Sequence, residues 1–428
     1  MNQQNQFSSL RPWFIWGLAA FFFFAHYVVR VTPGHISDEL QLAFEISKSD
    51  LGLLGMSFYI PYVLMQMPIG YLVDRFGSRA LLTIAVFICS ISSFIFANSE
   101  IISTAMFSRV LLGFCSATAF IGALKLITVW FDATKLALLV GITQALGMIG
   151  AAVGGHLVPI LNDEIGWEDS FKLYGFVFFC LSIIIYAVVR NGPKNLTSSS
   201  KKSSSNKISF DQLKIVLTSK FTWLNALYAG FIYSPTDCLG EFWGKEFIQN
   251  IHHLDSYQAS HSVAYLFIGW AIGGPIAGWL ADHVGRKPVM IGSAICGFIL
   301  LPIVFYVPNI PVTLISFIMF LYGLTNTGLI ASYTVAGELH EKTLGGFSMA
   351  IANMFSVLVG AGLMWVMGKL LDWNASKHLV FSEQGTLLHT TQDYQNSTII
   401  ITSCLLLAII CSLFTKETLN THRAAIDD

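Results

Sequence analysis

The chain has 428 residues, of which 54% are hydrophobic and only 11% carry a formal charge, as 24 basic and 25 acidic side chains. Soluble globular proteins contain about 25% charged residues, so this chain lacks the charge that a soluble protein of its length needs at its surface. The net charge of −1 offers no basic field for nucleic acid, and the hydrophobicity excludes an extended disordered protein. The composition therefore indicates a polytopic membrane protein.

Apolar runs of about 20 residues cross the hydrocarbon core of a bilayer as helices. Twelve such runs are predicted, in chain order: Trp13–Gly34, Leu51–Val73, Leu81–Ala97, Ile102–Trp130, Leu136–Ile160, Phe171–Val189, Trp223–Trp243, Ser262–Ala281, Val289–Val307, Pro311–Val335, Gly345–Leu371 and Ser397–Phe414. Glycines within these runs suit close packing of helices in a membrane. The seven cysteines also lie in apolar runs and lack the spacing of a disulfide framework or a zinc site.

A polar segment separates the sixth and seventh spans. Residues 190–220 include the stretch SSSKKSSS at 198–205, which predicts a flexible linker between an N-terminal bundle, 1–189, and a C-terminal bundle, 221–428. With twelve spans, the linker and both termini lie on one side of the membrane. That side carries 16 of the 24 Lys and Arg and the other side five, which predicts cytoplasmic termini. The remaining three, Arg30, Arg109 and Lys125, lie within spans.

A short motif occurs twice, at the predicted cytoplasmic ends of spans two and eight. Residues 70–79 are GYLVDRFGSR and residues 278–287 are GWLADHVGRK, so glycine, aspartate and basic positions recur 208 residues apart. Both segments resemble the loop signature of the major facilitator superfamily, G-x-x-x-D-[RK]-x-G-x-[RK]-[RK]. The resemblance covers the whole chain in span count and topology. It implies an all-α membrane protein with twelve transmembrane helices in two pseudo-symmetric six-helix bundles.

In that family the two loops latch one conformation of the transporter. The residues implied here are Gly70, Asp74, Arg75, Gly77, Arg79, Gly278, Asp282, Gly285 and Lys287. Glycines permit a tight turn, and an aspartate beside a basic residue can pair across the loop. A plain positively charged loop is the alternative. Arg109, in RVLLG, resembles the helix-four arginine of the family, which implies a structural or coupling role.

Charges within spans are expensive in a bilayer and are therefore expected to serve a purpose. Residues 24–31, FAHYVVRV, are similar to helix one of the organophosphate antiporters of the superfamily, where an arginine binds the substrate anion; Arg30 takes that place. Lys125 is the second cation expected at the substrate, although a lysine reaching for the interface is the alternative. His26 shares a helix face with Arg30 and either titrates during coupling or forms a structural hydrogen bond.

The seventh predicted span supplies groups of opposite charge. Tyr233, Asp237 and Glu241 recur every four residues and so share one helix face, while Pro235 and Gly240 predict a kink. We expect Tyr233 and Asp237 at the substrate and Asp237 and Glu241 in proton coupling, although Glu241 is close enough to the span end to be simply solvated. The list of substrate-binding candidates also includes Asn326, in the tenth span.

These features predict a secondary active transporter that moves a small carboxylate-bearing solute, either an organic anion or an amino-acid- or peptide-like zwitterion, by alternating access with coupled protons. A proton-driven drug or metabolite efflux antiporter and a non-transporting membrane sensor of the same fold are the alternatives. No enzyme motif, cofactor or metal cluster is expected, and the predicted partners are solute, proton and lipid. We expect a monomer in a bacterial inner membrane. The outer loop 372–396 contains no motif that we can interpret.

Overall fold

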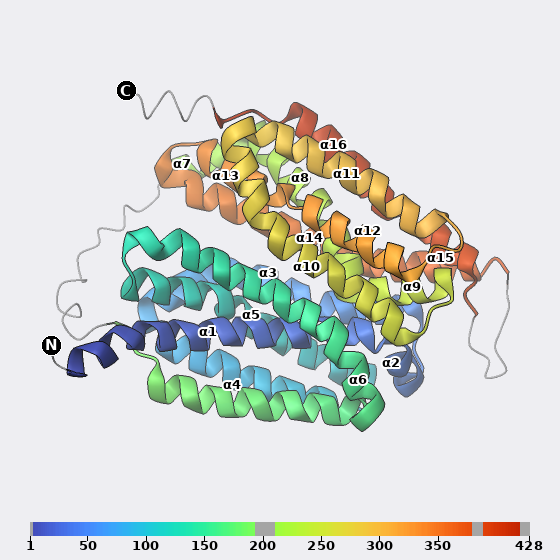
Figure 1. The fold of residues 1–428 in the computed structure, drawn as a ribbon, viewed down its shortest axis with the longest axis horizontal. Helices are drawn as coiled ribbons and strands as arrows, with labels where there is room; N and C mark the ends of the chain where they lie inside the picture. The colour runs from blue at the N-terminus through green and yellow to red at the C-terminus, as the bar shows by residue number, and fades with distance from the viewer. Residues whose placement is uncertain (1–2, 193–209, 379–387, 420–428) are drawn as a thin grey trace. The chain divides into compact units, whose positions relative to one another are not determined.

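The computed structural model describes residues 3–192, 210–378 and 388–419, and these residues form helices and connecting turns without a strand (Figure 1). The helices are α1 (Gln3–His35), α2 (Ser37–Phe44), α3 (Lys48–Phe76), α4 (Ser78–Ala97), α5 (Ile102–Trp130), α6 (Ala133–Val188), α7 (Phe210–Thr218), α8 (Lys220–Pro235), the π-helix η2 (Thr236–Trp243), α9 (Gly244–His252), α10 (Ser256–Val284), α11 (Arg286–Tyr306), α12 (Val312–Thr325), α13 (Gly328–Glu338), α14 (Lys342–Ala375), α15 (Thr391–Ser397) and α16 (Ile399–Phe414). The predicted all-α class is confirmed.

The helix lengths are consistent with twelve membrane crossings. Within the described residues, nine stretches are long and apolar enough to span a membrane, and α3, bent by 59° near Pro68, makes a tenth. Helix α6 has 56 residues and leaves helical geometry at Gly166. At 1.5 Å per residue it measures about 84 Å, more than twice a hydrocarbon core of about 30 Å, so it supplies two crossings. The consecutive elements α8, η2 and α9 supply the remaining one.

The repeated motif adopts the same backbone conformation in both places. Gly77 precedes α4 with φ 82° and ψ 153°, and Gly285 precedes α11 with φ 119° and ψ 154°. Side chains with a Cβ rarely adopt a positive φ of this kind, which explains why glycine stands at both turns. The sequence repeat is therefore also a structural repeat.

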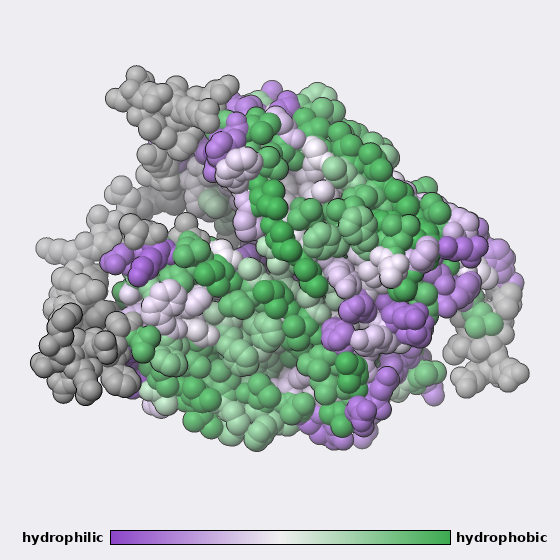
Figure 2. Space-filling view, viewed as in Figure 1, coloured by the Kyte–Doolittle hydropathy of each residue, from purple (hydrophilic) through white to green (hydrophobic). Residues whose placement is uncertain are grey.

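Small residues let the helices of the C-terminal part approach closely. Helices α10 and α12 pack along their length, as do α8 and α14. A Cβ on Gly323 of α12 would collide with the backbone carbonyl of Leu266 on α10, so only glycine allows this approach. Hydrophobic side chains cover the visible flanks of these helices, whereas hydrophilic ones gather near helix ends (Figure 2). Exposed flank residues such as Ile299 and Phe317 are the surface expected to face lipid.

The chain divides into two compact units. The first comprises Met1–Arg30, Ser57–Ala151 and Leu161–Asn206, and the second comprises Val31–Met56, Ala152–Ile160 and Lys207–Asp428. Segments that precede the predicted linker therefore pack with helices that follow it. Of that linker, residues 193–209 lie outside the described residues and residues 210–218 form α7. The halves predicted from sequence, 1–189 and 221–428, stay a prediction.

Candidate functional site

Arg30 lies near the end of α1 and is only 2% exposed. Four aromatic rings surround its guanidinium: the Cζ atom is 4.9 Å from the ring centroid of Tyr27, 5.5 Å from that of Phe58, 4.9 Å from that of Tyr59 and 5.7 Å from that of Tyr62. We call these four residues the aromatic cage. Tyr27 comes from α1 and the other three from one turn of α3. Such rings attract a cation without carrying a formal negative charge of their own.

A second buried guanidinium lies beside the first. Arg109 of α5 is 1% exposed, its Cζ atom is 4.9 Å from the ring centroid of Phe58, and both of its Nη atoms donate to the backbone carbonyl of Arg30 at 3.4 Å. His26 stacks on the same phenyl ring, with centroids 5.8 Å apart. Neither ring nitrogen of His26 has a hydrogen-bond partner among the described residues. Phe58 therefore joins three of the residues predicted from the sequence.

Lys125 takes part in a different contact. Its Nζ atom donates to Asp74 Oδ1 at 2.7 Å, and both side chains are well exposed, at 42% and 66%. In the same motif, Arg79 donates to the backbone carbonyl of Tyr186 at 3.0 and 2.8 Å and stacks on that ring. The structure thus brings Lys125 to the first loop motif, and it brings Arg109 to Arg30.

The second loop motif has a comparable network with different partners. Arg286 pairs with Asp282 and with Glu338, each at 3.0 Å. Glu417 accepts hydrogen bonds from the backbone N–H groups of Arg286 and Lys287. Partial burial raises the pKa of Glu417, but hydrogen bonds from backbone N–H groups outweigh it, so the pKa lies below its ordinary value. The sequence prediction missed Arg286, which occupies the position directly after the positive-φ glycine.

The seventh span contains the predicted break as a π-helix. Asp237 and Glu241 lie in η2 and are buried, and a Cβ on Gly360 of α14 would lie 2.5 Å from Asp237 Oδ2. Thr236 donates to the side-chain oxygen of Asn326 at 3.0 Å, at the break between α12 and α13. Short π-helical segments occur often at functional sites. The structure therefore brings Asn326 to the element that holds both carboxylates.

Tyr233 lies in the last turn of α8, directly before this π-helix. The side chain is buried, and its ring centroid is 6.1 Å from that of Trp270 on α10. The ring therefore packs between α8 and α10, and its residue precedes the π-helix in sequence.

A cluster of four charges joins the segment after α1 to the start of α9 within the second unit. Lys48 pairs with Glu246, and Lys245 pairs with Asp38, each at 2.6 Å. Glu246 also accepts a hydrogen bond from Tyr394 at 2.8 Å. Three of the four side chains are almost fully buried, and Asp38 is 41% exposed. We call these four residues the four-charge cluster.

Electrostatics keep Asp38 of this cluster ionised. Burial raises the pKa of Asp38, but the nearby ammonium of Lys245, with a smaller contribution from Lys48, outweighs burial and leaves the pKa below its ordinary value.

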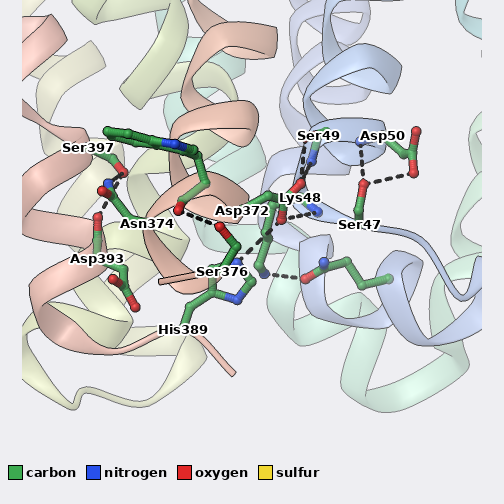
Figure 3. Close-up of polar contacts among 12 residues, drawn as sticks. Ser47, Lys48, Ser49, Asp50, Asp372, Asn374, Ser376, His389, Asp393 and Ser397 are labelled. Carbon is green, nitrogen blue, oxygen red and sulfur yellow. Dashed lines mark hydrogen bonds and ion pairs between the residues drawn. The ribbon is translucent and has the colours of Figure 1, made fainter. Parts of the chain in front are cut away.

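Asp372 of α14 extends this contact to the start of α3. Its carboxylate accepts hydrogen bonds from the backbone N–H groups of Lys48 and Ser49 at 3.3 and 2.8 Å, and from the Ser49 hydroxyl at 2.5 Å (Figure 3). A carboxylate at a helix N-terminus is stabilised by the unpaired N–H groups and by the helix dipole. His389 lies 3.4 Å away on the other side of the carboxylate. Within the described residues, no group of three or more His, Cys, Asp or Glu is arranged for a metal ion.

Comparisons with known proteins agree with this architecture. The sequence profile of the Major Facilitator Superfamily matches residues 14–364. A probable sulfoacetate transporter of Cupriavidus necator, SauU, is 22% identical over 399 residues, which cover 87% of this chain and 90% of that protein. A probable galactarate/D-glucarate transporter of Escherichia coli strain K12, GudP, is 23% identical over 369 residues, which cover 78% of this chain and 81% of that protein.

A solved structure shows the same fold. The crystal structure of a bacterial homologue of the human lysosomal transporter Spinster aligns with a TM-score of 0.72, covering 94% of this chain and 96% of that chain at 16% identity. Because the family profile covers most of the chain, the predicted family is confirmed. The chain belongs to the Major Facilitator Superfamily and is a multi-pass integral membrane transporter, not an enzyme.

Proposed function

We propose that this transporter carries a small organic acid with at least one carboxylate, and that Arg30 binds that carboxylate. The observation that carries the proposal is the pair of buried guanidinium groups, Arg30 and Arg109, that share the ring of Phe58. Two like charges in a medium of low dielectric repel each other, so an anion beside them is attracted by both. A guanidinium matches a carboxylate with two parallel hydrogen bonds, which favours an acid over a neutral solute.

The named substrates of relatives support the same class. Sulfoacetate, galactarate and D-glucarate are all small organic acids, and they are the solutes in the names of the two relatives described above. An amino-acid- or peptide-like zwitterion stays within the proposal, because it also carries a carboxylate that a guanidinium can bind. A cationic drug falls outside the proposal, because two buried guanidinium groups would repel it.

We further propose that protons drive this transport through Asp237 and Glu241. Both carboxylates are buried in the π-helix η2, within a predicted membrane span, and ionisable groups inside membrane spans often belong to proton or ion pathways. Short π-helical segments are frequent at functional sites, and the ion sites of transporters often lie where a membrane helix is interrupted. The coupling role predicted for His26 from the sequence stays a prediction.

We also propose a membrane location and an orientation for the transporter. The transporter acts as a monomer in a bacterial inner membrane, with both termini and the linker 190–220 in the cytoplasm, as the distribution of Lys and Arg supports. The two loop motifs then lie at the cytoplasmic side, where the ion pairs Lys125–Asp74 and Arg286–Asp282 support a latch. The role of Lys125 as a direct substrate ligand stays a prediction.

Uptake into proteoliposomes tests the substrate class. The measurement is accumulation of radiolabelled D-glucarate and sulfoacetate, with the outside at pH 6.0 and the inside at pH 7.5. Loss of a charge-assisted hydrogen bond costs about 1.5–3 kcal/mol, so Arg30→Gln should lower kcat/KM by about 10- to 150-fold. Lys172→Gln, which removes an exposed cation that pairs with Asp169 three residues earlier, is the matched control and should behave as wild type.

Counterflow separates coupling from binding. Asp237→Asn should abolish accumulation driven by the pH gradient but keep exchange of labelled for unlabelled solute.

Uptake by Arg30→Gln at the wild-type rate would contradict the proposed substrate site. Purified protein that exchanges none of a broad pool of organic acids, while relatives exchange theirs in parallel, would instead favour the membrane-sensor alternative.

A further inference from the structure

Two histidines from different helices meet within the second compact unit. His156 of α6 and His261 of α10 have their Nδ1 atoms 3.0 Å apart and their ring centroids 5.0 Å apart. The hydroxyl of Tyr257, one turn before His261, is 3.4 Å from Nδ1 of His156. His156 and Tyr257 are exposed and His261 is half-buried. The three side chains form one polar group contributed by two helices.

The position along α10 makes this group reachable from water. Helix α10 has 29 residues, about 43 Å, which exceeds a hydrocarbon core of about 30 Å by roughly four residues at each end. His261 is the sixth residue of α10 and therefore lies close to the membrane–water boundary. Tyr257, Gln258 and His261 also line a hollow of about 540 Å³, together with apolar side chains such as Ile268 and Phe317.

The chemistry of the pair suits a borderline-soft metal ion. Zn²⁺ binds imidazole nitrogen at about 2.0–2.1 Å and prefers tetrahedral geometry, which places two ligand nitrogens about 3.3 Å apart. From the observed 3.0 Å the rings must separate by about 0.3 Å, and they must turn so that both Nδ1 lone pairs point at one ion. At present one ring donates a proton to the other. If that proton moves to Nε2 of its own ring, both Nδ1 lone pairs become available and both rings stay neutral.

We propose that His156 and His261 form a binding site for a transition-metal cation, with Zn²⁺ as the reference ion and water in the remaining positions. Only two protein side chains supply nitrogen, so binding in the micromolar range is expected. The bound ion ties the 152–160 segment of α6 to α10. Alternating access requires such neighbouring helices to move, so the ion should also inhibit transport. That inhibition rests on the proposed function, whereas the binding does not.

Thermal unfolding of the purified full-length protein, with any affinity tag removed, tests the site. We expect 1–300 µM ZnCl₂ to raise the melting temperature and MgCl₂ to leave it unchanged, because Mg²⁺ prefers oxygen ligands. His156→Gln and His261→Gln should each raise the half-maximal Zn²⁺ concentration at least 10-fold. His253→Asn is the matched control: it removes another exposed histidine, and asparagine tolerates the positive φ found there.

A second readout covers variants that lose stability. Co²⁺ in place of Zn²⁺ should give visible d–d absorption bands in the wild type and in His253→Asn, and none in either site variant. Bands or a Zn²⁺ response that persist in both site variants would overturn the proposal, as would an equal response to Mg²⁺.

Transport assays distinguish failure of the site from failure of the proposed function. Inhibition by Zn²⁺ that disappears in His261→Gln supports both proposals. Histidine-dependent Zn²⁺ binding by a protein that transports no organic acid supports the site and removes the function. Active organic-acid uptake whose Zn²⁺ sensitivity survives both histidine substitutions removes the site and keeps the function.

Discussion

The molecule buries positive charge in two regions by different means. Around Arg30 in the first unit, the aromatic cage approaches the guanidinium with four rings. In the four-charge cluster of the second unit, Lys48 and Lys245 each contact a carboxylate at 2.6 Å. Rings lower the cost of burying a cation but leave its formal charge in place. Carboxylates neutralise that charge and fix the geometry.

This difference separates a binding role from a structural one. In the proposed function, the guanidinium lined by rings binds the carboxylate of a solute that enters and leaves during transport. A cation paired with a buried carboxylate is already neutralised, and the pair instead joins two segments, here the chain between α1 and α3 and the start of α9. We therefore expect substitutions in the four-charge cluster to lower stability, and substitutions in the aromatic cage to lower transport.

The largest effect is expected from unpairing Lys48. The substitution Glu246→Gln leaves the buried ammonium of Lys48 without its carboxylate partner. Removal of one partner from a buried ion pair costs about 3–5 kcal/mol. The free energy of unfolding should fall by that amount, and thermal unfolding in detergent monitored by tryptophan fluorescence should show a clear drop in melting temperature.

The double variant Lys48→Met/Glu246→Met is the control for this pair. Removing both charges removes the desolvation cost as well, so the double variant should be more stable than Glu246→Gln alone. An exposed substitution, Glu168→Gln, should leave the melting temperature unchanged. Equal stability of Glu246→Gln and wild type would mean that water solvates the Lys48 ammonium and that the ion pair does not stabilise the contact between the α1–α3 segment and α9.

The aromatic cage should show a smaller effect, on transport. Tyr59→Leu removes one ring 4.9 Å from the Arg30 guanidinium, and a desolvated cation–π contact contributes about 0.5–2 kcal/mol. Uptake of D-glucarate below KM should fall by about 2- to 30-fold. Tyr59→Phe keeps the ring and should stay within about twofold of wild type. If the two variants lose the same activity, the hydroxyl group matters and the ring does not.

An effect on rate alone is expected at the first loop motif. The pair Lys125–Asp74 is exposed, and such pairs contribute about 1 kcal/mol or less. If the pair acts as a latch, Lys125→Gln and Asp74→Asn should change the maximal uptake rate to a similar extent and leave KM unchanged. A rise in KM for Lys125→Gln alone would place Lys125 at the substrate instead. Measuring both parameters for both variants decides between the two roles.

Local sequence patterns predicted the fold and indicated individual candidate residues for the site. Apolar runs gave the helices, the repeated motif located the two loops, and Pro235 with Gly240 indicated the break that appears as η2. Arg30 was found because a charge within an apolar run costs free energy wherever the run lies. Such signals are contained in a few neighbouring residues and need no knowledge of the tertiary structure.

Pairings across long distances in sequence could not be predicted in this way. Lys48 and Lys245 lie just outside predicted spans, where a lysine is expected to be solvated, yet each is buried against a carboxylate. The partners of Lys48 and His156 lie 198 and 105 residues away. One local signal existed: three charges within six residues, at Glu241, Lys245 and Glu246, are unusual at the end of an apolar span.

The smallest expected effect concerns the pH dependence of stability in the four-charge cluster. Its contribution to stability should not change over the pH range in which uptake is expected to change. The pKa of Asp38 lies below its ordinary value because of Lys245 and Lys48. A carboxylate with a lowered pKa contributes stability above the ordinary value of about 4, and loses it as the pH falls through the lowered pKa. The melting-temperature difference between wild type and Asp38→Asn should therefore stay constant from pH 7.5 to 5.0 and shrink below about pH 4.

A difference that already shrinks between pH 7 and 5.5 would show that the ammonium groups do not hold Asp38 ionised. A constant difference assigns any pH dependence of uptake in that range to groups outside the cluster, of which Asp237 and Glu241 are the first to replace.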